Sequence, residues 1–265
     1  MPVKVGCQTY IWAAYANKFG FKYPLRCVIS EVAATGFKGL DLSGFSIDQL
    51  GSPDDFKALV KEFKLKLVSM SNGVGDSQRE RIVQTKRNFE WLAETGVKVS
   101  MVGGGGVEKD EDPEDTFKRL VEQCDELEEF GREVGVKPAF HNHLWTVVET
   151  REQIERFLES TKMGWCPDTG HMAGAGCDPL DLIKKYRRKV RMGHLKDAVV
   201  DKKGKWQRFI ELGRGNAGVD VPAMLAYLTE SKFNGWFTVE QDQTTRSPCT
   251  DQLHNAEYLK GLGYL

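Results

Sequence analysis

Short apolar segments rich in β-branched residues alternate with amphipathic segments along the whole chain, and this alternation constrains its fold most strongly. The apolar segments predict eight strands, at residues 3–10, 37–44, 65–72, 97–106, 136–143, 163–171, 190–197 and 233–242. The amphipathic segments predict eight helices, at residues 23–36, 52–64, 79–96, 112–135, 150–161, 178–186, 220–231 and 250–263. Strands that alternate with helices in this way indicate a parallel sheet built from βα units.

The expected helix boundaries carry residues that favour those positions. Ser52 is suited to the N-cap of one helix because Pro53 and two acidic residues follow it, and Thr150 is suited to the N-cap of another. Gly36 and several other glycines stand between the end of a helix and the next apolar segment, as in "TGFKGLDL", "TGVKVSMV" and "VGVKPAF". These signals support the division of the chain into helices and strands.

Eight βα units predict an α/β fold, a single (β/α)8 TIM barrel, and one domain over residues 1–265. A doubly wound open sheet is the alternative, but no G-x-G-x-x-G motif follows the first strand. The segment "VGGGGVEK" after the fourth strand lacks both that spacing and a Walker lysine. We interpret it as a barrel loop that needs close backbone approach, with phosphate binding as the other interpretation.

The charge balance argues against a nucleic-acid partner, since 37 basic residues stand against 38 acidic ones. No apolar stretch is long enough for a membrane span, and the N-terminus lacks the apolar core of a signal peptide. The six cysteines show no CxxC spacing and are expected to be reduced thiols. We therefore expect a cytoplasmic protein without a membrane partner. A homo-oligomer is possible, but no self-complementary surface can be identified from the sequence.

Polar and charged residues gather at the ends of the late strands, where TIM barrels place their functional residues. Four of the five histidines fall there, and only His254 lies in a helix. One such histidine is usually structural, but several on consecutive strands together with carboxylates indicate a site. The residues at these strand ends are His141, Asn142, His143, Asp168, His171, His194, Lys196, Asp197, Glu240 and Asp242.

Imidazole and carboxylate groups together suit a borderline divalent ion such as Mn²⁺, Co²⁺ or Zn²⁺. Fe²⁺ and Mg²⁺ are the further candidates for a single divalent metal cofactor. Cys166 shares a strand with Asp168, but we interpret it as a packing residue because Pro167 can break the alternation between them.

The order of the motifs "HNH", "PDTGH", "GHLKD", "GRGNAGVDVPAML" and "GWFTVEQD" resembles the xylose isomerase-like TIM barrel superfamily of sugar isomerases and epimerases. The similarity extends over essentially the whole chain. It implies that Asp168, His194 and Glu240 are metal ligands and that His171 faces the substrate. The fourth ligand of the family is usually a glutamate on the fifth strand, and here that position holds His141.

The "HxH" pair on the fifth strand is similar to the inosose (2-keto-myo-inositol) dehydratase branch of this superfamily. That branch has "YHHHxGT" where this chain has "AFHNHLWT", and "GFKGLDL" and "DTGH…DPLDLIKK" extend the similarity. The family epimerases use glutamates of the fifth and eighth strands as an acid–base pair. Because His141 replaces the first of these, the resemblance puts the two-carboxylate mechanism in doubt.

We therefore expect proton abstraction α to a carbonyl of a small polyhydroxylated substrate, a keto-sugar or cyclitol, through a metal-bound enediolate. His143 and His171 are the candidate bases, and the resemblance adds Glu240 to the catalytic residues. Expulsion of a β-hydroxyl would give inosose-type dehydration, which we favour. The alternatives are a ketose epimerase, an aldose–ketose (sugar phosphate) isomerase, and an inactive sugar-binding barrel.

Further polar and aromatic residues are expected to bind the substrate. If the first strand continues past residue 10, its alternation places Gln8, Tyr10 and Trp12 on one face, although packing is an equal explanation for the two aromatic residues. An endonuclease IV-like DNA-repair enzyme would need more metal ligands and a basic groove, and we set that class aside. The expected substrate-binding residues are Gln8, Tyr10, Trp12, Asp41, Trp145 and Lys196. For Lys196, an ion pair with Asp197 or with another acid of the rim is an equal alternative.

Overall fold

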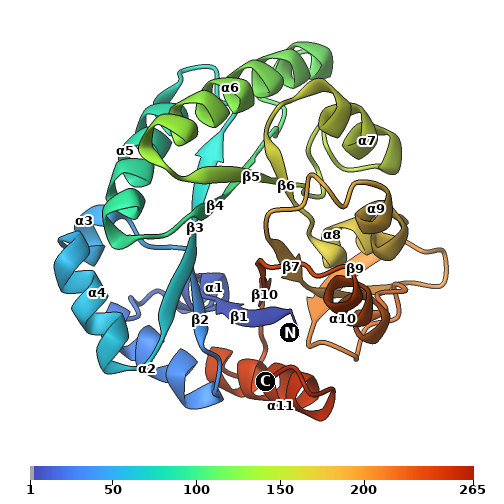
Figure 1. Ribbon diagram of the computed structural model, residues 1–265. Coiled ribbons are helices and arrows are strands. Elements are labelled where there is room, and N and C mark those ends of the chain that lie inside the picture. Colours follow the sequence, from blue (N-terminus) through green and yellow to red (C-terminus); the bar gives the residue numbers. More distant parts are fainter. Residues whose placement is uncertain (1–2) are drawn as a thin grey trace.

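A computed structural model describes residues 3–265 and shows parallel strands enclosed by helices (Figure 1). The strands are β1 (Lys4–Gln8), β2 (Gly39–Leu42), β3 (Lys66–Val74), β4 (Val99–Gly104), β5 (Lys137–His141), β6 (Gly164–Cys166), β7 (Gly193–Leu195), β8 (Asp197–Val200), β9 (Trp206–Ile210) and β10 (Trp236–Val239). The helices are α1 (Tyr10–Phe19), α2 (Leu25–Thr35), α3 (Ile47–Leu50), α4 (Pro53–Glu62), α5 (Glu80–Thr95), α6 (Pro113–Val134), α7 (Arg151–Ser160), α8 (Thr169–Gly174), α9 (Pro179–Lys185), α10 (Val221–Glu230) and α11 (Pro248–Gly261).

The main sheet closes into a barrel. Its eight strands follow the order β6-β5-β4-β3-β2-β1-β10-β7, and neighbouring strands pair in parallel. The two end strands meet through isolated parallel bridges, between Trp165 and Val190 and between Asp168 and His194. The predicted TIM barrel is thus confirmed, and the doubly wound alternative is wrong.

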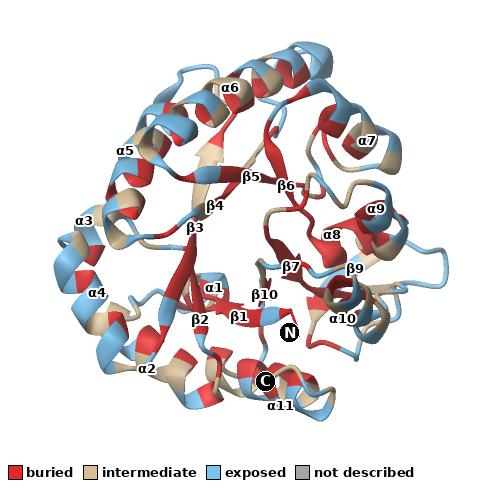
Figure 2. Ribbon diagram, in the orientation of Figure 1, coloured by how far each residue is buried: buried red, intermediate tan, exposed pale blue. Residues whose placement is uncertain are grey.

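Buried apolar side chains fill the layer between the strands and the helices, and a smaller apolar cluster lies inside the barrel. Figure 2 shows buried residues along the barrel strands and on the helices that cover them. The helix boundaries agree with their sequence signals: the Ser52 hydroxyl accepts a hydrogen bond from the Asp55 amide, and Thr150 forms a capping box with Gln153. Within residues 3–265, no helix combines the length and apolar character that a membrane span requires.

The prediction for the end of the first strand is wrong. β1 stops at Gln8, and the ten-residue helix α1 begins at Tyr10. The aromatic residues here suggested a strand, but three alanines among them favour a helix. Trp12 is consequently fully buried in the core, where its indole nitrogen donates to Glu31 at 2.6 Å. It does not share a face with Gln8 and Tyr10, and it cannot bind substrate.

Two further segments differ from the sequence prediction. The sixth strand stops at Cys166, and the helix α8 begins at Thr169, so His171 lies on a helix. After the seventh strand, β8 and β9 form an antiparallel hairpin outside the barrel. The sequence analysis assigned no helix or strand to residues 198–219, because the charged residues of this segment conceal the two short strands.

The glycines of "VGGGG" permit close contact between two strands. A Cβ atom on Gly104 would lie 2.0 Å from the Val74 carbonyl oxygen, and Gly105 has a φ of 85°. The Gly105 carbonyl then accepts a hydrogen bond from the Val147 amide at 2.9 Å. This agrees with the interpretation of the segment as a loop that needs close backbone approach.

Candidate metal centre and substrate cavity

Four residues from the strand ends meet in the interior at one end of the barrel. His141 ends β5, Asp168 follows β6, His194 lies in β7, and Glu240 follows β10. Each offers one potential ligand atom, these atoms lie within 4.8 Å of one another, and all four residues are buried. They converge because the carboxyl ends of parallel barrel strands meet on one rim.

Two of the four potential ligand atoms, His141 Nδ1 and Asp168 Oδ2, are buried without a hydrogen-bond partner. The other two, His194 Nδ1 and Glu240 Oε2, are buried 2.5 Å from one another. Unpaired buried polar atoms are rare in folded proteins because losing water without a new partner costs free energy. Two imidazole nitrogens and two carboxylate oxygens that face one another fit a divalent cation. Cys166 lies within reach of His141 and His194 and is a further potential ligand.

The orientation of His194 is set by a residue on another strand. His194 Nε2 lies 3.1 Å from Asp41 Oδ2, which also accepts a hydrogen bond from the Thr238 hydroxyl at 2.9 Å. This contact directs Nδ1 toward the centre, 2.5 Å from Glu240 Oε2. Burial alone would lower the pKa of His194, but Cys166, Glu240 and Asp41 raise it well above its usual value. Asp41 is fully buried and does not line the cavity of about 500 Å³ that opens over the four converging residues. The prediction that it binds substrate is therefore wrong.

Replacing Asp41 with asparagine should weaken binding of Mn²⁺ by about tenfold or more, because an amide holds the imidazole of His194 less strongly and does not raise its basicity. Calorimetric titration of the metal-free protein with Mn²⁺ measures the effect. The exposed Asp48 of α3 supplies a control, since Asp48→Asn should leave the affinity unchanged. Equal Mn²⁺ affinity in the two variants would contradict the assigned role of Asp41.

Lys196 is fully buried among the acidic residues of the centre. Its ammonium lies 2.8 Å from Asp242 Oδ1 and 3.4 Å from both Asp168 Oδ2 and Glu240 Oε2. Burial raises the pKa of Asp168 to about 7, while the Lys196 charge opposes that rise. Lys196 does not line the cavity, so the predicted contact with substrate is wrong, and Lys196 forms an ion pair with Asp242 instead. Asp197 instead accepts hydrogen bonds from the Gly213 and Gly215 amides.

A cavity of about 500 Å³ opens over the four converging residues, and we call it the metal-side cavity. Among the predicted residues, those that line it are Gln8, Tyr10, His141, His143, Trp145, Glu240 and Asp242. Gln8 donates a hydrogen bond to Glu240 Oε1 at 2.9 Å, which leaves Oε2 directed toward the other candidate ligands. The sequence analysis did not single out Arg81, which lines the same cavity from α5.

The two remaining histidines differ in access. His143 lines the cavity, and its Nδ1 donates to the Leu144 carbonyl at 2.7 Å. His171 is buried beside it, with ring centroids 3.7 Å apart, but does not line the cavity. Its Nδ1 accepts from the Leu144 amide, and its Nε2 lies 3.0 Å from Lys196 Nζ. Burial lowers the pKa of both rings, so both are neutral near pH 7.

Asn142, between the two histidines of "HNH", has a structural role. Its side-chain oxygen accepts hydrogen bonds from the Trp165 indole and from the Asp168 backbone amide, both at 3.1 Å. It therefore connects the end of β5 to the end of β6 and helps to place Asp168.

The sequence profile of the xylose isomerase-like TIM barrel family matches residues 29–262. The chain belongs to this family, as the strand-end motifs indicated. It is similar to the inosose dehydratase of Geobacillus kaustophilus, at 29% identity over 98% of this chain and 95% of that protein. It is also similar to the inosose dehydratase of Clostridium tetani, at 25% identity over 97% of this chain and 96% of that protein.

Solved structures show the same fold. The structure of the IOLI protein with a zinc atom superposes with a TM-score of 0.78 at 18% identity, and the match covers 99% of each chain.

Proposed function

We propose that this chain is a divalent-metal-dependent enzyme that removes a proton α to a carbonyl of a small keto-sugar or cyclitol, with inosose-type dehydration as its reaction. The observation that carries the proposal is the convergence of four buried potential ligand atoms beneath the metal-side cavity, two of which have no hydrogen-bond partner. Two relatives named inosose dehydratase, matched over nearly their whole length, support the choice of reaction.

His141, Asp168, His194 and Glu240 would hold the cation. When bound, it would supply Lewis-acid polarisation of the substrate carbonyl. The two imidazoles favour Mn²⁺, Co²⁺, Zn²⁺ or Fe²⁺ over Mg²⁺, which prefers oxygen ligands. The convergence of these potential ligand atoms argues for an intact site rather than an inactive sugar-binding barrel.

His143 is the base that the geometry favours. Because its Nδ1–H donates to the Leu144 carbonyl, the lone pair of Nε2 is left to accept a proton from a molecule in the cavity. His171 contacts Lys196 instead, so we assign it a positioning role in place of the catalytic role expected from the sequence.

A single base on one face of the substrate suits elimination. In that reaction Nε2 of His143 takes the α-proton, the C–H electron pair forms the new C=C bond, and the β-hydroxyl leaves. The protonated imidazole can then give its proton to the departing oxygen, so that water is the only other product. The α-proton and the hydroxyl would leave from the same face.

Epimerisation or isomerisation is the second candidate, because Glu240 also lines the cavity and could return a proton at another position. Product analysis in D₂O separates the reactions. Dehydration yields an unsaturated ketone, whereas an epimerase or isomerase yields an isomer of the substrate that carries deuterium and has lost no water.

The test begins with the metal content of protein purified without chelator. We expect about one divalent ion per chain and, with Mn²⁺ or Co²⁺ present, conversion of 2-keto-myo-inositol to the unsaturated ketone. Protein that neither contains nor takes up a divalent ion would overturn the proposal in favour of a sugar-binding barrel. Metal binding with turnover of other keto-sugars only would overturn the inosose assignment.

Trp145 provides a separate prediction about substrate binding. Its side chain is 61% exposed at the cavity, its φ is 63°, and the Trp206 ring of the hairpin contacts it edge-on, with centroids 5.0 Å apart. Trp145→Ala should raise the KM by about tenfold, a loss of about 1.4 kcal/mol in binding, and change kcat little. Steady-state kinetics measures KM and kcat separately. Trp145→Phe, which keeps an aromatic face, should recover part of the lost affinity, whereas an unchanged KM in Trp145→Ala would exclude a contact with substrate.

A further inference from the structure

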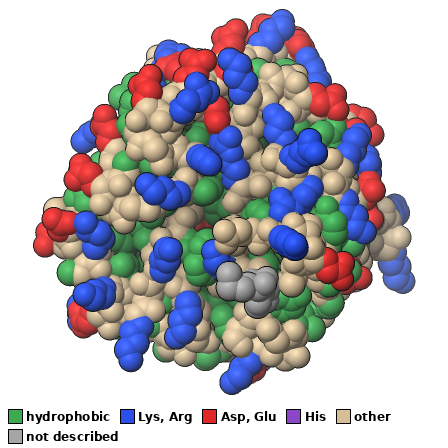
Figure 3. Space-filling model, in the orientation of Figure 1, with side chains coloured by type: hydrophobic (Ala, Val, Ile, Leu, Met, Phe, Trp, Pro, Cys, Tyr) green, Lys and Arg blue, Asp and Glu red, His purple; other side chains and the backbone are tan. Residues whose placement is uncertain are grey.

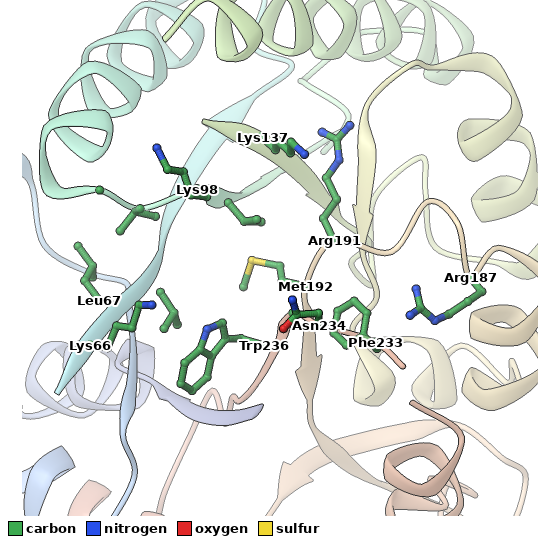
Figure 4. Close-up of a pocket in the computed structure, with 15 residues that line it drawn as sticks. Lys66, Leu67, Lys98, Lys137, Arg187, Arg191, Met192, Phe233, Asn234 and Trp236 are labelled. Atoms are coloured by element: carbon green, nitrogen blue, oxygen red, sulfur yellow. The ribbon is translucent and has the colours of Figure 1, made fainter. Parts of the chain in front are cut away.

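A second cavity lies at the opposite end of the barrel, where the strands begin. It has a volume of about 420 Å³, and we call it the basic cavity (Figure 4). Lys66 begins β3, Lys137 begins β5, and Trp236 begins β10, so the basic cavity lies at the other end of the strands from the metal centre. The proposed reaction makes no use of it.

All the charged side chains that line the basic cavity are cationic. They are Lys66, Lys98, Lys137, Arg187 and Arg191. Figure 4 shows Lys66 and Lys98 on one side and Arg187 on the other, with Met192 and Trp236 between them. Figure 3, which has the orientation of Figure 1, shows Lys and Arg side chains over the middle of this face, whereas Asp and Glu lie mostly near its edge.

Most of this positive charge is not neutralised by the protein. Among residues 3–265, Lys66, Lys98 and Lys137 form no ion pair with a carboxylate. Arg187 has no carboxylate partner in this part of the chain either: it donates to the Ser231 hydroxyl at 3.1 Å and lies over the Phe233 ring. Arg191 alone is paired, through two contacts with Glu128. Like charges around one concave surface raise its positive potential and concentrate anions there.

The remaining lining is largely apolar. Leu67, Val97, Met192, Phe233 and Trp236 contribute side chains to it. Met192 also packs with Met101, Ala139 and Cys166, an apolar cluster inside the barrel. A ligand in the basic cavity would therefore meet cations around an apolar surface, and this cluster lies between it and the metal centre.

We propose that the basic cavity binds a small molecule that carries phosphate groups on an apolar or aromatic body. Lysine ammonium and arginine guanidinium groups suit phosphate oxygens, and the apolar lining suits the rest of such a molecule. The volume is within the range of small-molecule pockets, about 300–1,000 Å³, and a concave site of this size excludes a nucleic-acid duplex. The site does not depend on the proposed function, because it shares no residue with the metal centre.

Calorimetric titration with inorganic tripolyphosphate tests the charged part of the site. The variant Lys66→Gln/Lys98→Gln/Lys137→Gln should bind it about tenfold more weakly or worse, because each lost ammonium removes a screened attraction. The control Lys109→Gln/Lys202→Gln/Lys203→Gln changes the net charge equally at exposed positions elsewhere and should bind like the unmodified protein. Thermal unfolding shows whether each variant is folded.

Three outcomes would overturn the proposal: no binding of tripolyphosphate, equal weakening in both triple variants, or tight binding of a short DNA duplex that depends on the same lysines. The last would indicate a nucleic-acid surface instead. Arg187→Gln should also weaken binding of tripolyphosphate. Turnover at the metal centre should stay unchanged in all these variants, so failure here is distinguishable from failure of the proposed reaction.

Discussion

Replacing Asp168 with asparagine should abolish metal binding and lower turnover by at least about 100-fold. Asp168 Oδ2 is one of the four converging ligand atoms and has no hydrogen-bond partner, and an asparagine would place either a weaker ligand oxygen or an NH₂ donor there. Asp168 Oδ1 also accepts the His171 amide at 2.8 Å and so caps α8, but asparagine caps a helix as well as aspartate does. The variant should therefore fold. Elemental analysis and kinetics after Mn²⁺ addition measure the two effects.

Asp178→Asn is the matched control. Asp178 caps α9 by accepting the Leu180 and Asp181 amides, and the substitution makes the same chemical change outside the site. It should retain one metal per chain and full turnover. A normal metal content in Asp168→Asn would remove Asp168 from the ligand set and with it the main support for the proposed centre.

The second large effect is expected for Lys196→Met. Methionine is of similar length, so the packing of the side chain against Gly170 should survive, but the cation among Asp168, Glu240 and Asp242 is lost. Removing one partner of a buried ion pair typically destabilises a protein by about 3–5 kcal/mol. We expect a loss of this size in the free energy of unfolding of the metal-free protein, measured with urea.

Added Mn²⁺ should recover part of that loss, because a bound cation restores positive charge among the same carboxylates and stabilises the folded state. Lys185→Met provides the contrast: its ion pair with Glu155 is at the surface, where such pairs contribute about 0–1 kcal/mol. If Lys196→Met were no less stable than Lys185→Met in the absence of metal, the ion-pair role of Lys196 would be wrong.

The barrel and the positions of the candidate ligands were predictable because both depend on local patterns. Alternation of strands and helices predicts parallel strands, and the ends of such strands converge on one rim. This pattern placed His141, Asp168, His194 and Glu240 on one rim among ten polar residues, and the resemblance to the family selected these four as candidate ligands. The structure brings their ligand atoms within 4.8 Å of one another.

The boundary after the first strand was not predictable in the same way. Gln8, Tyr10 and Trp12 have a spacing that suits a strand, but the strand ends at Gln8. Thr9 is the N-cap of α1, which contains the alanines that follow. A short aromatic segment has only a weak preference for a strand, and contacts with the rest of the protein decide whether it forms a strand or a helix. Trp12 consequently lies in the core, where it hydrogen-bonds Glu31.

The sequence by itself determined the number and order of the βα units and the rim on which the candidate ligand residues lie. Only the tertiary structure decided which partner each polar side chain has: Asp41 contacts His194, 153 residues away along the chain, and Lys196 pairs with Asp242 rather than with Asp197. It also brought Lys66, Lys98 and Arg187 around one cavity. The physical reason is that the spacing of apolar residues reflects which face of a segment is buried. The pairing of polar side chains depends instead on distances between segments, which only the closed barrel sets.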